Sequence, residues 1–145
     1  MKNLRIGMLA VFALFPVIAW SGQVHSIWSS KPMFVSDPST TNATAVSGNC
    51  SLSWNEATGQ AFVNARAKNI SGDIFEFQLV SLTANAGMDH LDGYWNITKN
   101  GVPVCTQCLG TAYGLSSGVG NYFKIYVDNS KYHLSAYISN RFDYF

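Results

Sequence analysis

The sequence predicts an all-β fold: a single-domain antiparallel β-sandwich built of hairpins and meanders, with a flattened β-barrel as the alternative. Two observations predict it. Apolar and polar residues alternate with a period of two over at least seven segments, and short turns rich in Gly, Asn and Asp separate these segments. Many short strands joined by short turns are typical of a sandwich or a barrel.

A meander of three strands is expected first, over residues 50–54, 60–68 and 74–81. The turn lengths set small residues opposite large ones, such as Ala67 opposite Phe75, and interdigitation requires that pattern. The same register sets Arg66 opposite Glu76 on the outer face, a favourable cross-strand ion pair. A slip by one residue would lose these pairs. The register therefore predicts that Cys50 faces the core.

A second hairpin is expected around Asn100-Gly101, which lies between alternating runs. Asn-Gly at this place predicts a type I′ turn, because both turn residues must take positive φ. Pro103 has no N–H to donate, so its strand is expected to be an edge or to contain a bulge. The expected apolar face consists of Trp95, Ile97, Val102 and Val104. The expected pairs are Lys99 with Val102, Thr98 with Pro103, Ile97 with Val104 and Trp95 with Thr106.

The last hairpin is expected over residues 122–127 and 132–139, after a Gly- and Ser-rich loop at 110–121. A four-residue turn pairs Val127 with Tyr132, and it places Phe123, Ile125 and Leu134 on the core face. The opposite face then carries three tyrosines, a lysine and a histidine. These residues are Tyr122, Lys124, Tyr126, His133 and Tyr137.

The start of the chain predicts export. Lys2 and Arg5 precede an uncharged apolar run at 6–20, and small residues follow, an order typical of a secretory signal peptide. We expect residues 1–21 to be this peptide, with cleavage after Ser21 or Ser26. The run is shorter than the roughly 20 residues of a spanning helix, so no membrane span is expected after its removal. Residues 27–48 are expected to be an extended lead-in, and 49–145 the β domain.

The composition limits the partners that the chain can have. Charged residues make up 12% and aromatic residues 14%, and the net charge is +1. Such a charge provides no attraction to nucleic acid or to an anionic membrane. We therefore expect a secreted or periplasmic protein with no nucleic-acid partner, and no motif in the sequence calls for a cofactor.

Three cysteines are present, and an exported protein normally forms a disulfide from such a set. Residues three apart on an extended strand have Cα atoms about 10 Å apart, which exceeds the limit for a disulfide. Cys105 and Cys108 can therefore pair only where the chain turns. The hairpin register places Cys108 on the core face with Cys50, so the expected disulfide joins Cys50 to Cys108. A bulge caused by Pro103 would favour Cys105 instead.

The loop at 88–93 contains Asp89, His90 and Asp92, two carboxylates and an imidazole. Such a group is a weak candidate for a cation site or an acid/base pair. The simpler interpretation is a polar turn that ends at Asp92-Gly93.

The polar face of the last hairpin is the favoured functional feature. Tyrosines supply large contact areas at low entropic cost and are enriched in recognition surfaces. The first hypothesis is therefore a secreted non-enzymatic binding protein that recognises a carbohydrate or a protein through this face and the adjacent loop. The alternatives are a secreted inhibitor or effector that acts on a partner protein, and a small secreted hydrolase.

Overall fold

The fold is described from a computed structural model. It covers residues 24–30, 32–55, 57–83, 90–114 and 122–144, so the predicted signal peptide and Asp89 lie outside the described residues. The described residues form ten strands and no helix. The strands are β1 (Val24–Ser29), β2 (Pro32–Asp37), β3 (Thr40–Asn55), β4 (Ala61–Asn69), β5 (Ile74–Leu82), β6 (His90–Lys99), β7 (Val102–Tyr113), β8 (Tyr122–Val127), β9 (Tyr132–Tyr137) and β10 (Asn140–Tyr144).

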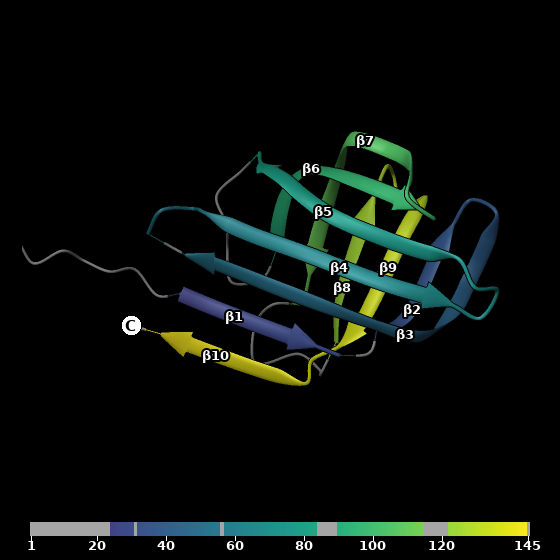
Figure 1. Cartoon of the computed structure of the whole chain (residues 1–145). Coiled ribbons are helices and arrows are strands. Elements are labelled where there is room, and N and C mark those ends of the chain that lie inside the picture. Colours follow the sequence, from purple (N-terminus) through teal and green to yellow (C-terminus); the bar gives the residue numbers. More distant parts are fainter. Residues whose placement is uncertain (1–23, 31, 56, 84–89, 115–121, 145) are drawn as a thin grey trace, which may run out of the picture.

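The all-β prediction is confirmed, and the architecture is the barrel alternative. One antiparallel sheet runs in the order β2–β9–β8–β7–β6–β5–β4–β3, and β3 pairs again with β2, so the eight strands close into a ring (Figure 1). β1 pairs with the second half of β3, and β10 pairs with β1. Because β1 and β2 both run antiparallel to β3, they act as one interrupted first strand.

The segment 27–48 is extended, as expected, but it is an integral part of the barrel. The second half of β1 and all of β2 lie within it, and β3 runs without a break from Thr40 to Asn55. The expected boundary at residue 49 between a lead-in and the β domain is therefore not a structural boundary. Only the pairing of β2 with β9 closes the ring, and that contact is too distant in sequence to show in a local pattern.

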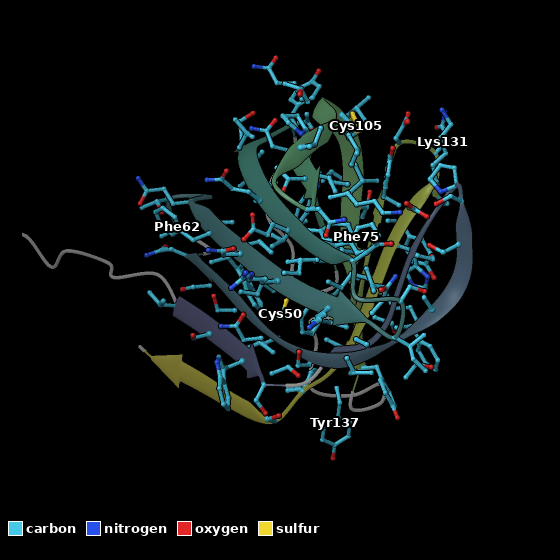
Figure 2. The ribbon with its side chains drawn as sticks, turned by 45° about the vertical axis from the view of Figure 1, so that its right-hand side comes forward. Cys50, Phe62, Phe75, Cys105, Lys131 and Tyr137 are labelled. Atoms are coloured by element: carbon cyan, nitrogen blue, oxygen red, sulfur yellow. A yellow bond between two sulfur atoms is a disulfide. The ribbon has the colours of Figure 1, made fainter. Side chains whose placement is uncertain are left out.

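The barrel interior is filled by apolar side chains from every strand of the ring. The meander registers are confirmed: Ala67 pairs with Phe75 and Arg66 with Glu76. Phe75 and Cys50 point into the barrel (Figure 2), and burial of a side chain the size of Phe stabilises the fold by about 2 kcal/mol. The largest fully buried side chains are Trp54, Trp95, Phe75, Phe77 and Phe123.

The β6–β7 hairpin starts as predicted. Asn100 and Gly101 take φ values of 54° and 78°, and Lys99 pairs with Val102. Two irregularities follow, so that Ile97 pairs with Cys105 instead of Val104, and Trp95 pairs with Cys108 instead of Thr106. β7 thus contains two residues more than a regular ladder would. The prediction for Val102 and Val104 was wrong, because these side chains are 62% and 37% exposed.

The predicted disulfide between Cys50 and Cys108 was also wrong. Cys105 and Cys108 form the disulfide, with Cα atoms 5.9 Å apart, and Cys50 is a free, buried thiol. The irregular backbone explains the pairing. Gln107 has a φ of 52°, and its N–H donates to Oδ1 of Asn96 at 3.0 Å. This left-handed residue turns the chain, which brings two cysteines within reach that an extended strand would hold apart.

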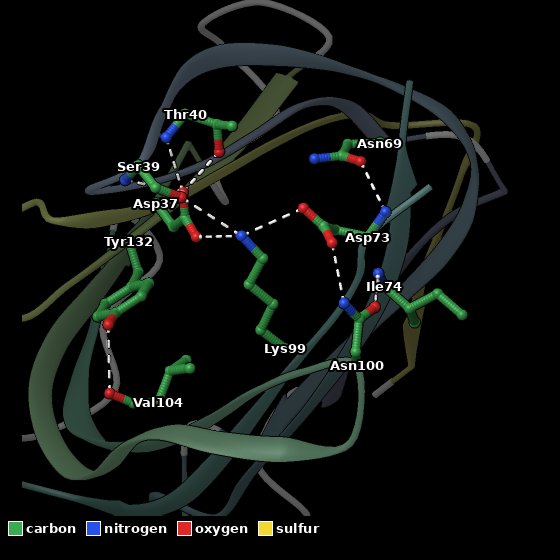
Figure 3. Close-up of polar contacts among 10 residues, drawn as sticks. All are labelled: Asp37, Ser39, Thr40, Asn69, Asp73, Ile74, Lys99, Asn100, Val104 and Tyr132. Carbon is green, nitrogen blue, oxygen red and sulfur yellow. Dashed lines mark hydrogen bonds and ion pairs between the residues drawn. The ribbon is translucent and has the colours of Figure 1, made fainter. Parts of the chain in front are cut away.

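A polar cluster lies at one end of the barrel (Figure 3). Lys99 donates to Oδ2 of Asp37 at 2.8 Å and lies 3.1 Å from Oδ2 of Asp73. Asp37 also accepts hydrogen bonds from the backbone N–H and hydroxyl groups of Ser39 and Thr40. The cluster thereby joins the β2–β3, β4–β5 and β6–β7 turns, which are far apart in sequence.

Candidate functional site

The five residues of the predicted polar face lie together on the outer surface of β8 and β9. The predicted register is confirmed: Tyr122 pairs with Tyr137, and Tyr126 pairs with His133. Tyr122 and Tyr137 are each 41% exposed, and Lys124 is exposed between them and Tyr126. The chain from Asn140 to Tyr144 pairs with β1, and Figure 2 shows Tyr137 pointing away from the barrel.

The aromatic rings form two groups rather than one flat platform. The rings of Tyr122 and Tyr137 meet edge to face, with centroids 5.5 Å apart. Those of Tyr126 and His133 are stacked, with centroids 4.4 Å apart and an interplanar angle of 6°. Because stacked rings cover part of each other's faces, the second group presents mainly ring edges and the tyrosine hydroxyl to a ligand.

Tyr113 extends the second group, although the sequence pattern did not place it there. Its ring lies edge to face against Tyr126 at 5.9 Å, and its side chain is 46% exposed. β7 continues to Tyr113 and pairs with β8, although the segment from residue 110 onwards was predicted to be a loop. The outward alternation of Leu109, Thr111 and Tyr113 was the available signal, and the high Gly and Ser content of the segment concealed it.

The surroundings of His133 favour the neutral form of its imidazole. Partial burial lowers the pKa of its imidazole, and the nearby positive charge of Lys124 lowers it further. Its Nε2 atom is buried and has no hydrogen-bond partner among the described residues. The imidazole of His133 stacks on the phenol ring of Tyr126 and restricts the positions that this ring can take.

A groove of about 340 Å³ runs beside Tyr126, and we call it the Tyr126 groove. One wall is aromatic, from Tyr113 and Tyr126, and the remainder is polar apart from Leu109. The residues that line it are Thr83, Asp92, Leu109, Gly110, Thr111, Tyr113, Tyr126, Asn129 and Ser130. Strands β6, β7 and β8, the residue after β5 and the β8–β9 turn therefore all contribute to one binding-sized depression.

Asp92 contributes a hydrogen-bonding carboxylate to the groove. Thr111 donates its hydroxyl proton to Oδ1 of Asp92 at 2.6 Å, and Nε2 of His90 lies 3.4 Å from Oδ2. Two of the three residues of the weak candidate cation site therefore lie side by side, because His90 and Asp92 are two residues apart on β6 and share its outer face. Within the part of the chain that the structure describes, no three ligating side chains form a metal-sized cluster.

Comparisons with protein-family models, with curated proteins and with solved structures found no match for this chain. The described residues contain no helix that is long and apolar enough to cross a membrane. The case for function therefore depends on the geometry of the site alone.

Proposed function

We propose that the protein is a non-enzymatic binding protein that recognises a neutral carbohydrate through the Tyr126 groove. One observation carries the proposal: tyrosine rings, a carboxylate, hydroxyls and an amide converge on a single shallow depression. A tyrosine presents an apolar ring and a hydrogen-bonding tip, which suits a ligand with apolar C–H edges and many hydroxyls. The volume suits one or two sugar rings.

The charges of the groove favour a neutral ligand. Among the described residues that line the groove, Asp92 is the charged one, and none of them is a lysine or arginine. A carboxylate accepts hydrogen bonds from sugar hydroxyls, and it would repel an acidic sugar. Thr111 donates to Oδ1 of Asp92 and Nε2 of His90 lies 3.4 Å from Oδ2, so a ligand hydroxyl would donate to a remaining lone pair of this carboxylate.

The hydrolase alternative has less support. Catalysis by a His–Asp pair needs a nucleophile that donates a proton to the imidazole. Here the hydroxyl that contacts the pair belongs to Thr111, and it donates to Asp92 rather than to His90. The inhibitor alternative would use the same face against a protein, and the experiment below separates it from carbohydrate binding.

The proposal includes export from the cytoplasm. An intramolecular disulfide between Cys105 and Cys108 fits an oxidising compartment, where such bonds persist. The basic, apolar and small-residue order of the first 21 residues supports the same location.

The experiment is glycan-array binding of the purified protein, followed by titration calorimetry with the best neutral ligand. Tyr126→Ala and Asp92→Asn should each weaken binding by about tenfold or more, as expected for central contacts. The matched control is Ile70→Ala, which truncates a 76% exposed side chain on the β4–β5 turn. Circular dichroism would check that each variant is folded.

Each outcome has a definite meaning. Loss of binding in Tyr126→Ala with retention in Ile70→Ala supports the groove. Loss only in a Tyr122→Ala/Tyr137→Ala double variant would move the site to the other aromatic group. If the folded wild-type protein binds no glycan, the carbohydrate proposal is rejected and a protein partner takes its place.

A further inference from the structure

The wall of the barrel is split between β4 and β5. Their ladder runs from Lys68↔Ile74 to Asn64↔Gln78 and ends there, although β4 begins at Ala61 and β5 continues to Leu82. Figure 1 shows the two strands side by side at one end and diverging towards the other. We call this opening, between residues 61–63 and 79–82, the β4–β5 seam.

A bulge in β5 explains why the strands separate. Leu79 pairs with Trp95 and Ser81 pairs with Tyr94, so Val80 is an extra residue on the β6 side. Leu79 is buried, whereas Val80 and Ser81 are both exposed, which marks a reversal of the alternation. A bulge bends its strand and increases the local twist. β5 therefore stays paired with β6 and separates from β4.

The seam presents backbone hydrogen-bonding groups. The N–H of Asn69 donates to the carbonyl of Asp73 across the β4–β5 turn at 2.9 Å. Because backbone groups alternate sides along a strand, Ala61 and Val63 also direct theirs towards β5. The ladder provides no partner on β5 for Ala61. β4 is thus a strand edge over this short length, inside an otherwise closed ring.

The side chains at the seam are apolar or uncharged. Phe62 is 72% exposed and Val80 is 46% exposed, and Figure 2 shows Phe62 pointing away from the barrel. Phe62 lines two clefts, of about 270 and 250 Å³. Among the described residues, no charged side chain lines either cleft. Natural strand edges are normally protected from pairing by charges or proline, and this edge has neither.

We infer that the β4–β5 seam binds an extended, uncharged peptide segment of a partner protein as an added strand. Main-chain hydrogen bonds to β4 would provide affinity, and an apolar side chain between Phe62 and Val80 would provide specificity. The lack of charge along the seam matches an uncharged segment and would not attract a basic or acidic one. Three strand residues span about 10 Å, so the segment inserts only a short stretch.

This surface is separate from the Tyr126 groove. The clefts at the seam are lined by residues of β1 and β3 to β5 with the turn before β4, whereas the groove draws most of its lining from β6 to β8 and the turn after β8. The two binding activities can therefore be tested independently, and failure of one does not bear on the other.

The experiment is selection from phage-displayed octapeptides that contain no charged residue, with the mature wild-type protein as the target. Selected peptides are then synthesised and titrated against two variants. Phe62→Lys/Val80→Lys adds edge-protecting charges at exposed positions, and Ile70→Lys/Val102→Lys does the same at apolar side chains outside the seam. Binding should fall by about tenfold or more in the first and remain unchanged in the second.

A second measurement keeps the test independent of the variants. A selected peptide should protect the Ala61 amide from hydrogen exchange. A peptide of the same sequence in which every second residue is N-methylated should not bind, because the backbone N–H donors along one side of its strand are missing. Failure to enrich any peptide, or equal binding to the folded Phe62→Lys/Val80→Lys variant, would overturn the inference. Dimerisation of the chain through the seam would overturn it as well, because a second copy would then be the occupant.

Discussion

Replacement of Asp37 by Ala should remove the bonds that hold three turns together at one end of the barrel. The Asp37 side chain is only 7% exposed, and it accepts hydrogen bonds from Lys99, Ser39 and Thr40. Burial alone would raise the pKa of this carboxyl group, but the hydrogen bonds from Lys99, Thr40 and Ser39 outweigh burial and lower the pKa well below its usual range. The folded state therefore strongly favours the charged form.

The cost follows from what the substitution leaves behind. A hydrogen bond to a charged group contributes about 1.5–3 kcal/mol, and the contributions within one cluster overlap. Lys99 keeps Asp73 as a partner at 3.1 Å, so its charge is not stranded. The backbone N–H groups of Ser39 and Thr40 lose their acceptor. We expect Asp37→Ala to lower the free energy of unfolding by about 3 kcal/mol, which corresponds to about 10 °C in Tm for a domain of this size.

The assay is urea denaturation of the wild type and the variant between pH 2 and pH 8. A carboxyl group with a lowered pKa stabilises the fold above its unfolded pKa, near 4, and loses that effect as the pH falls towards the folded pKa. The difference in free energy of unfolding between the wild type and Asp37→Ala should therefore be constant from pH 5 to 8 and become smaller below about pH 4.

The control is Glu76→Gln, which removes the charge of an exposed pair with Arg66. Its side chain is 48% exposed, so the substitution should cost less than about 0.5 kcal/mol. A gap below about 1 kcal/mol for Asp37→Ala, or one that does not change with pH, would refute the reasoning about the cluster.

Three further predictions concern the core and the cysteines. Gly110→Ala should destabilise the fold by about 2 kcal/mol in urea titrations, because a Cβ there would lie 2.7 Å from Cδ1 of Trp95; an unchanged midpoint would argue against the packing. The double variant Cys105→Ser/Cys108→Ser should have a free energy of unfolding about 2 kcal/mol lower than that of the wild type, as the closure of such a short loop implies. Dithiothreitol should lower the free energy of unfolding of the wild type by the same amount and leave that of the variant unchanged. Burial raises the pKa of the Cys50 thiol, so iodoacetamide should label it only in denaturant, as mass spectrometry would show; rapid labelling of the native protein would contradict its position.

Local pattern was sufficient to predict those parts of the fold that depend on turn length and alternation. Arg66 lies opposite Glu76 and Tyr122 opposite Tyr137 because short turns fix the register of consecutive strands. The same reasoning placed five polar-face residues on one surface. Closure of the ring was beyond local pattern, since it depends on β2 pairing with β9, about a hundred residues later.

The candidate site was predicted only in part, because half of it depends on tertiary contacts. The sequence placed Tyr126 and His133 on the outer face but could not show that their rings stack. It treated Asp92 as a member of a turn, whereas Asp92 lies on β6 beside Thr111 of β7. Two strands outside the last hairpin, β6 and β7, thus complete the groove, and no pattern within that hairpin indicates them.

The sequence pattern could not predict the bulges of β7 for a more specific reason. The positions of Gly93 and Gly110 show the structural role of these bulges. Two extra residues preserve the inward and outward parity of a strand, so the hydrophobic pattern is the same with or without them. With them, Gly93 pairs with Gly110, and a Cβ on Gly110 would collide with the ring of Trp95. In the regular register Gly110 would lie opposite Leu91, two residues away from Gly93. The bulged register therefore leaves space for the buried Trp95 ring beneath the Tyr126 groove, and that packing, rather than the turn at Asn100-Gly101, selects the register of the second half of β7.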